Sequence, residues 1–138
     1  MMKECVFCNI ISGEIPSSKI YEDDQTIAFL DIAKDVDGHI LVISKKHCIS
    51  ILDADNDTLF SIAKTVKKIS NHLVEHCGYD GINLLNASGE SAGQSVPHFH
   101  IHIIPRKNGD EMDLWPKLKG AEQDLQTIYE KIRFFTET

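Results

Sequence analysis

The run His-Phe-His-Ile-His-Ile-Ile at residues 98–104 alternates polar and apolar side chains, and this alternation constrains the fold most strongly. Successive side chains of a β-strand point to opposite faces, so the pattern predicts a strand with three histidines on one face. The apolar Phe99, Ile101 and Ile103 then point into the core. Three buried histidines in register would each need a hydrogen-bond partner, which makes a purely structural role the weaker interpretation.

Other segments of the chain show helical or strand periodicity of their own. Apolar residues at three- and four-residue spacing predict a long helix and a C-terminal helix, and short apolar runs predict further strands. The predicted helices lie at residues 5–12, 55–76 and 123–135, the strands at 26–31, 39–44 and 81–86, and an extended stretch follows Pro16. The polar turn at 34–38 makes a hairpin-like connection. Because strands and helices do not alternate regularly, we expect an α+β fold with a largely antiparallel sheet.

The length of 138 residues predicts one domain over residues 1–138, with a core at about 5–107 and a helical tail at about 119–136. The net charge of −7 argues against nucleic-acid or anionic-membrane partners, which require a basic surface. No apolar run approaches the roughly 18 residues of a membrane span, and the N-terminal segment is too short for a signal peptide. We therefore expect a cytoplasmic protein with reduced cysteines.

The spacing of the three histidines favours separate roles for them. Residues two apart on a strand lie roughly 6.6–6.8 Å apart at Cα, so one straight strand cannot easily surround a tetrahedral ion. A neutral imidazole can attack phosphorus covalently, and a second one can protonate the leaving group. The glycine-containing loop at 89–95 lets backbone N–H groups approach an anion, and Gln94 and Ser95 add side-chain donors. These features predict phosphoryl or nucleotidyl transfer.

Cys5 and Cys8 have the spacing of half a zinc site. A tetrahedral structural site needs two further ligands, which the spacing alone does not name. The alternative interpretation is that both cysteines pack in the core, as free cysteine often does.

The motif at 98–104 resembles the histidine triad (HIT) family, whose pattern is three histidines alternating with apolar residues. Agreement extends over residues 5–107 and includes the segments 15–16, 21–23, 28–32, 38–39, 45–47, 92–96 and 104–106. The chain is most similar to the bacterial Hint-like branch of small nucleotide-binding hydrolases. The resemblance implies a five-stranded, largely antiparallel sheet with two main helices. It also implies a homodimer that joins two sheets into ten strands, with the helix face at 59–73 at the interface.

The resemblance also implies roles for particular residues. His100 would be the nucleophile, His102 would contact phosphate and assist proton transfer, and His39 would orient the histidine cluster. Ser95 would lie near the leaving group, and the backbone of Gly93, Gln94 and Ser95 near the phosphate. Asp31, with Ile32 beside it, would accept a ribose hydroxyl, and the base pocket would be formed by Phe7, Ile10, Phe29 and Leu30.

Two further positions bear on the resemblance. Relatives carry Asn or Gln where this chain has Ala87, and the neighbouring Asn86 is the candidate replacement at the nucleotide. Trp115 lies in a region through which relatives reach the partner's active site, and local packing is the alternative interpretation.

Many bacterial relatives bind structural zinc, and the matching ligands here are Cys5, Cys8, His47 and His98. The expected activity needs no metal in the chemical step. It is the release of a nucleoside monophosphate, AMP in the first instance, from its phosphorus-linked leaving group through a nucleotidyl-His100 intermediate. The ligand would be a purine nucleotide of the AMP or GMP type. The alternatives are a non-catalytic nucleotide-binding adaptor, a dinucleoside polyphosphate hydrolase and a metallohydrolase centred on the histidine strand.

Overall fold

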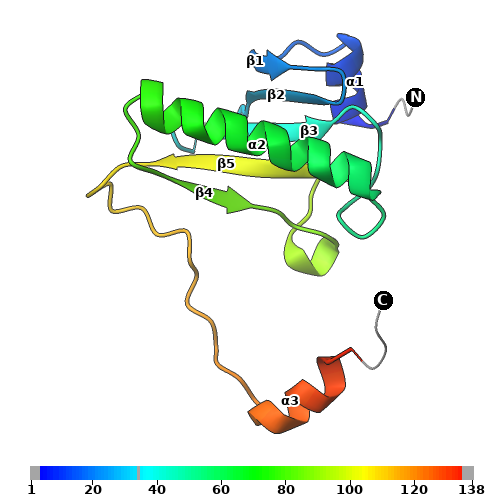
Figure 1. Ribbon diagram of the computed structural model, residues 1–138, viewed down its shortest axis with the longest axis vertical. Coiled ribbons are helices and arrows are strands. Elements are labelled where there is room, and N and C mark those ends of the chain that lie inside the picture. The colour runs from blue at the N-terminus through cyan, green and yellow to red at the C-terminus, as the bar shows by residue number, and fades with distance from the viewer. Residues whose placement is uncertain (1–3, 34, 135–138) are drawn as a thin grey trace.

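The computed structural model describes residues 4–33 and 35–134. Its elements are α1 (Val6–Ser12), β1 (Lys19–Glu22), β2 (Thr26–Leu30), β3 (Ile40–Ser44), α2 (Asn56–His76), β4 (Gly81–Leu85), the 3₁₀ turn η1 (Glu90–Ala92), β5 (His100–Arg106) and α3 (Leu125–Ile132). The strands form one antiparallel sheet in the order β1-β2-β3-β5-β4 (Figure 1). The predicted α+β class and the five-stranded antiparallel sheet are therefore confirmed.

Strand β5 lies inside the sheet, between β3 and β4. Its first residue, His100, lies opposite Ile43 of β3, and His102 lies opposite Leu41. The two edge strands are β1 and β4. The histidine-bearing strand is thus held on both sides by backbone hydrogen bonds, which fixes the positions of its side chains.

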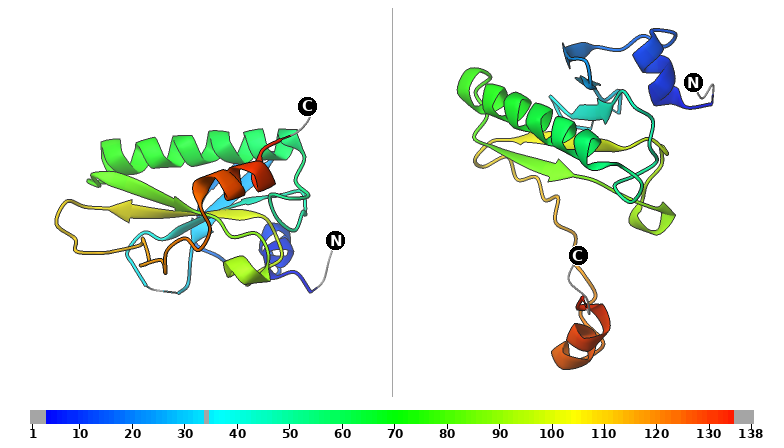
Figure 2. Two further views of the ribbon diagram at one scale, coloured as in Figure 1. Left: turned by 90° about the horizontal axis from the view of Figure 1, so that it is seen from below. Right: turned by 45° about the vertical axis from the view of Figure 1, so that its right-hand side comes forward.

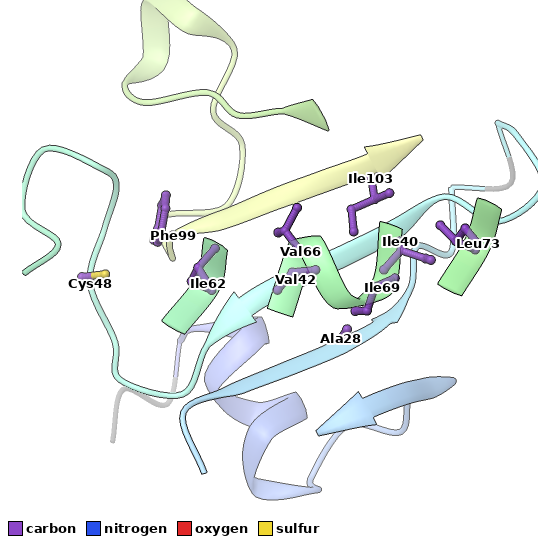
Figure 3. Packing of buried hydrophobic residues seen from close by; sticks show 10 residues of the cluster. All are labelled: Ala28, Ile40, Val42, Cys48, Ile62, Val66, Ile69, Leu73, Phe99 and Ile103. Carbon is purple, nitrogen blue, oxygen red and sulfur yellow. The ribbon is translucent and has the colours of Figure 1, made fainter. Parts of the chain in front are cut away.

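Helix α2 packs along one face of the sheet (Figure 2). Asp55 caps its first turn by accepting a hydrogen bond from the backbone N–H of Thr58 at 2.8 Å. One apolar stripe of α2 packs with Ala28, Val42, Phe99 and further sheet residues in the main core (Figure 3); the stripe consists of Ile62, Val66, Ile69 and Leu73. The chain's own sheet covers these four residues of the face at 59–73, and a subunit interface on the exposed residues of this segment stays a prediction.

Helix α1 covers part of the opposite face. Alternate residues of β2 and β3 point to this side, and a second core cluster joins Ile27, Phe29, Leu41 and Ile43 to Cys5, Phe7 and Cys8. Cys5 caps the helix, and Gly13 ends it in the left-handed conformation at φ 86°. The N-terminal helix is thereby placed against β2 and β3, and β3 is the neighbour of the histidine-bearing strand β5.

Two predicted boundaries need correction. The strand predicted over 98–104 begins only at His100 and runs to Arg106, because the backbone N–H of Phe99 donates to the carbonyl of Cys48 instead of continuing the ladder. Of the tail expected at 119–136, the part described up to residue 134 forms a helix at residues 125–132, and this helix buries no side chain. Strand β1, at Lys19–Glu22, lies in the stretch for which the sequence predicted only extended backbone.

The tail extends from the end of β5 away from the sheet, so that α3 lies apart from the other elements (Figures 1 and 2). Residues 135 and 136 of the predicted tail, and Lys34 of the predicted turn, lie outside the described residues. Among the described helices, none combines the length and the apolar character that crossing a membrane requires.

Candidate active site

A cavity of about 450 Å³ opens beside the start of β5, between α1, the end of β2 and the loop before β5. Its lining is mostly apolar, with His100, His102, Asp31 and Ser95 as its main polar groups. Nine residues expected at the nucleotide site line it, namely Phe7, Ile10, Phe29, Leu30, Asp31, Ile32, Ser95, His100 and His102. An apolar cavity with a few convergent polar groups is typical of small-molecule sites.

His100 is buried at the inner end of this cavity. Its Nδ1 lies 2.6 Å from the backbone carbonyl oxygen of His98. A carbonyl oxygen can only accept, so Nδ1 carries a proton and Nε2 of the neutral ring keeps its lone pair. Burial lowers the pKa of His100, which favours this neutral form. The ring edge of Phe7 packs against it at 5.1 Å between centroids. The local geometry therefore presents a fixed, unprotonated nitrogen.

His102 lies next to His100, and its Nδ1 is 2.9 Å from Nε2 of His39. Burial, followed by the neighbouring His100 and His39, lowers the pKa of His102 to about 4. His39 is buried behind it and contacts two carboxylates, Asp35 Oδ1 at 2.8 Å from Nδ1 and Asp31 Oδ2 at 3.6 Å from Nε2. We call Asp31, His39 and His102 the carboxylate cluster; their ligand atoms lie within 4.8 Å of one another.

A second cluster lies at the other end of the histidine motif. The thiol cluster consists of Cys5, Cys8, His47 and His98, whose ligand atoms also lie within 4.8 Å of one another. His98 Nδ1 is 3.4 Å from the sulfur of Cys5, 3.6 Å from that of Cys8 and 3.1 Å from Nδ1 of His47. The Cys8 sulfur lies 3.3 Å from His47 Nδ1. Four residues from three separate segments thus direct soft donor atoms toward one point.

These distances fit a tetrahedral metal site. Metal–sulfur bonds of about 2.3 Å and metal–nitrogen bonds of about 2.0–2.1 Å place neighbouring ligand atoms roughly 3.3–3.8 Å apart. His98 donates from Nε2 to the carbonyl of Ser44 at 2.7 Å, so its Nδ1 offers a lone pair. Burial lowers the pKa of His98 to about 4, which keeps the ring in the neutral form that binds a metal. The thiol cluster can hold a structural ion away from the cavity.

The loop before β5 brings Ser95 to the cavity. Gly93 adopts φ 91°, the left-handed region that favours glycine, and turns the chain out of η1. Gln94 differs from its expected role, because its side-chain amide donates to the carbonyls of Ile49 and Val96 and accepts from the backbone of Gly89. Its side chain holds the loop together, and neither Gln94 nor Gly93 lines the cavity.

Asn86 also has a different role from the one expected. Its side-chain Nδ2 donates to the carbonyl of His100 at 2.7 Å. Asn86 does not line the cavity. This hydrogen bond joins the chain just after β4 to the first residue of β5. Asn86 therefore contributes to placing His100 from outside the cavity.

Sequence reasoning missed two kinds of residue at the site. The cavity is also lined by Val6, Ile15, Pro16, Ser17, Ala33, Leu41 and Val96, most of them small or apolar residues without a chemical signature. Asp35 was missed as well, although it lies four residues before His39 in the same loop. A carboxylate close to a candidate site histidine is the signal that could have identified it.

Comparison with known proteins agrees with this geometry. The profile of the HIT domain matches residues 12–109. The Protein hit of Bacillus subtilis is 44% identical over 94% of this chain and 92% of its own length. The adenosine 5'-monophosphoramidase hnt1 of Schizosaccharomyces pombe is 35% identical over 93% of this chain and 95% of its own. The adenylylsulfatase HINT3 of Arabidopsis thaliana is 42% identical over 80% of this chain but only 56% of its own length.

Solved structures show the same fold. A HIT family protein from Bacillus subtilis superimposes with a TM-score of 0.82 and 38% identity, covering 98% of this chain and all of the other. A zinc-bound histidine triad family protein from Mycobacterium smegmatis gives a TM-score of 0.77 and 38% identity, covering 80% and 81% of the two chains. The motif, the matched profile and these likenesses together place the chain in the HIT family.

Proposed function

We propose that this protein is a nucleotide hydrolase that releases a nucleoside monophosphate, AMP in the first instance, from a phosphorus-linked leaving group. One observation carries the proposal: Nδ1 of His100 contacts the His98 carbonyl, which leaves Nε2 available, and the ring lines a mostly apolar cavity large enough for a small ligand. The names of two relatives, an AMP phosphoramidase and an adenylylsulfatase, support adenine nucleotides as the substrate class.

In the first step, Nε2 of His100 attacks the α-phosphorus. The phosphorus–nitrogen bond forms while the bond to the leaving group breaks, and the leaving group takes a proton from solvent. In the second step, water attacks the nucleotidyl-histidine and gives a proton to Nε2 of His102. The phosphorus–nitrogen bond then breaks, the nucleoside monophosphate leaves, His100 recovers its lone pair and His102 returns its proton to solvent.

The cavity supplies recognition and electrostatic support in this proposal. Phe7 and Phe29, whose rings meet edge to face at 5.7 Å, form part of an apolar wall for the base. Asp31 would accept a ribose hydroxyl. Ser95 would act at the leaving group, and its backbone N–H would approach the phosphate oxygens. The backbone N–H groups of Gly93 and Gln94, also expected there, donate instead to the carbonyls of Glu90 and Gly89. The apolar wall has little to distinguish adenine from guanine, so a purine of either kind would bind.

The thiol cluster would hold structural zinc. Two sulfurs and two nitrogens are the ligand set of many structural zinc sites, and the zinc-bound relative from Mycobacterium smegmatis supports this metal. When bound, the ion would tie α1 to the segment before β5 and would take no part in the chemical steps. The nucleophile His100 is two residues from the ligand His98, so the ion would stabilise the backbone that positions it.

The expected homodimer fits the exposed edge of the sheet. Strand β4 is an edge strand, and the side chain of Leu84 on it is 52% exposed. Pairing of two β4 strands would give a ten-stranded sheet and cover this edge. The expectations of a cytoplasmic location and of no nucleic-acid partner stay predictions.

The test is to measure turnover of four substrates: an adenosine phosphoramidate, adenylyl sulfate, an acyl adenylate and a dinucleoside polyphosphate. We expect AMP release from at least one of them by the unaltered protein and none by His100→Ala. His72→Ala is the matched control, because His72 lies exposed on α2 and outside the cavity. Binding of AMP without turnover of any substrate would instead identify a non-catalytic nucleotide-binding protein, and exclusive cleavage of the dinucleotide would identify the polyphosphate hydrolase.

A further inference from the structure

Asp35 contacts the histidine cluster from outside the cavity. Its Oδ1 lies 2.8 Å from Nδ1 of His39, and its side chain is 54% exposed, whereas that of His39 is 9% exposed. Neither Asp35 nor His39 lines the cavity. Asp35 therefore acts on bound substrate only through His39 and the residue that His39 contacts next, His102.

The carboxylate determines which nitrogen of His39 carries the proton. An ionised carboxylate can only accept, so the contact with Asp35 requires a proton on Nδ1. Neutral His39 then has its lone pair on Nε2 and accepts a hydrogen bond from Nδ1 of His102, 2.9 Å away. His102 in turn keeps its own lone pair on Nε2. The hydrogen bond from His39 lowers the pKa of Asp35, which keeps the carboxylate ionised.

A second carboxylate favours the opposite arrangement. Asp31 Oδ2 lies 3.6 Å from Nε2 of His39, so it favours a proton on that nitrogen. A proton on Nε2 would reverse the hydrogen bond to His102 and would place the proton of His102 on its own Nε2. The side chain of His39 contacts Asp31, Asp35 and His102, and the shorter contact to Asp35 decides between the two arrangements.

We infer that Asp35 is a positioning residue that sets the direction of the hydrogen bonds from His39 to His102 and thereby keeps Nε2 of His102 free to accept a proton. In the second step proposed above, water gives its proton to this nitrogen while its oxygen attacks phosphorus. Reversal of these hydrogen bonds would place a proton on Nε2 of His102. Water then loses its proton acceptor, and hydrolysis of the nucleotidyl-histidine becomes slower. The reversal leaves the first attack by His100 in place, because His98 holds that ring separately.

The first experiment needs no substrate. Nitrogen-15 NMR of the histidine rings reports the tautomers of His39 and His102 at pH 7, with His39→Gln used for assignment. We expect Nδ1–H on both rings in the unaltered protein and a shift of the proton toward Nε2 in Asp35→Ala. Asp37→Ala is the matched control, because Asp37 is an exposed carboxylate of the same loop. Unchanged tautomers in Asp35→Ala would overturn the inference whether or not the protein is a hydrolase.

The second experiment rests on the proposed function. In Asp35→Ala we expect kcat to fall roughly tenfold, the usual lower range for a residue that orients a functional histidine, with KM within about twofold. The nucleotidyl-protein should accumulate, because only its hydrolysis is slowed. Asp35 Oδ1 also accepts from the backbone N–H of Val36 at 2.9 Å, so loop disruption is the competing explanation. The Oδ1 of Asp35→Asn can accept both from that N–H and from Nδ1 of His39, so this variant should stay close to the unaltered protein. A loss of turnover in Asp35→Ala without accumulation of the intermediate would identify loop disruption, and the positioning role would be wrong.

Discussion

The thiol cluster and the carboxylate cluster lie at the two ends of one histidine motif, yet they differ in access and in donor atoms. The thiol cluster combines two sulfurs with imidazoles, and three of its four residues are buried. The carboxylate cluster combines one carboxylate with two imidazoles, and Asp31 and His102 line the cavity. Soft donors closed off from solvent favour a structural ion, whereas imidazoles at a cavity can exchange protons with a substrate. His98 and His102 are thus the same residue type in different environments, and we expect the environment to separate their roles.

In both clusters and at His100, a hydrogen bond to one ring nitrogen fixes the tautomer of a histidine. Three of the rings each have one nitrogen bonded to an oxygen that can only accept: the Ser44 carbonyl for His98, the His98 carbonyl for His100 and the Asp35 carboxylate for His39. The other nitrogen is left with its lone pair for a metal, for phosphorus or for the neighbouring ring. Three different chemical outcomes therefore depend on the same constraint.

The largest expected effect separates the nucleophile from the metal ligands. His100→Ala removes the attacking nitrogen, and we expect turnover to fall roughly 10⁴-fold or more, as for other covalent nucleophiles. The metal content should stay at the level of the unaltered protein, because His100 is not one of the four converging ligands. Kinetics and elemental analysis of the same preparation check both statements. Loss of metal together with turnover would show that the two clusters are not separate.

The next effect is on stability. Cys8→Ala removes one ligand of the thiol cluster, and we expect a loss of metal and of several kcal/mol of unfolding free energy, on the order of 3–5. Chelator should destabilise the unaltered protein but not the variant. Cys48→Ala is the control, since Cys48 is equally buried but lies outside the cluster. Thermal unfolding with and without chelator measures this, and equal losses in the two variants would contradict a structural metal.

A smaller effect concerns pH. The pKa of His102 is lowered from 6.5 to about 4 in the folded protein, mainly by burial. The unfolded chain therefore binds the proton first, so the stabilisation is complete above pH 6.5 and is lost as the pH falls toward 4. Between pH 7.5 and 4.5 we expect the unaltered protein to lose about 1–2 kcal/mol more than His102→Gln.

Urea unfolding at the two pH values measures this difference. Both proteins retain the thiol cluster, so its own response to acid cancels in the comparison. His72→Gln, a substitution of an exposed helix residue, should behave like the unaltered protein. An equal pH response of His102→Gln and the unaltered protein would show that His102 takes its proton as readily in the folded state as in the unfolded state.

The smallest expected effect tests whether Asn86 contacts the backbone of His100 or the nucleotide. Asn86→Ala removes one hydrogen bond to the carbonyl of His100, and we expect a loss of about 1 kcal/mol in stability. Because Asn86 does not line the cavity, KM should stay within about twofold. Nucleotide titration and steady-state kinetics test this. A tenfold rise in KM would show instead that Asn86 contacts the nucleotide.

The sequence predicted the periodic elements well. Alternation and helical spacing predicted the strand of the histidines and helix α2, whose predicted start at 55 falls on its capping Asp55. The boundary at His98 was missed because it depends on tertiary contacts, namely the hydrogen bond from Phe99 to Cys48 and the position of His98 in the thiol cluster. Local pattern holds no information on such contacts.

The candidate site was partly predictable for a similar reason. Cys5, Cys8 and the three histidines of the motif stand out in the sequence by type and spacing, whereas Asp31, His39 and His47 were named through the family resemblance; all of them lie in the two clusters or, for His100, between them. Gln94 and Asn86 were expected at the nucleotide, but their amides bond nearby backbone groups that only the folded loop brings within reach. Asp35 was overlooked among other acidic residues, since only its contact with His39 distinguishes it.

The most direct test of the account is to trap the covalent intermediate. The protein would be mixed with the best of the four substrates, quenched in alkaline denaturant, where phosphorus–nitrogen bonds survive, and mapped by peptide mass spectrometry. The account predicts a nucleotidyl group on the peptide that contains residues 98–106, located at His100 and absent from His100→Ala. A modified residue other than His100, or full turnover by His100→Ala, would contradict it.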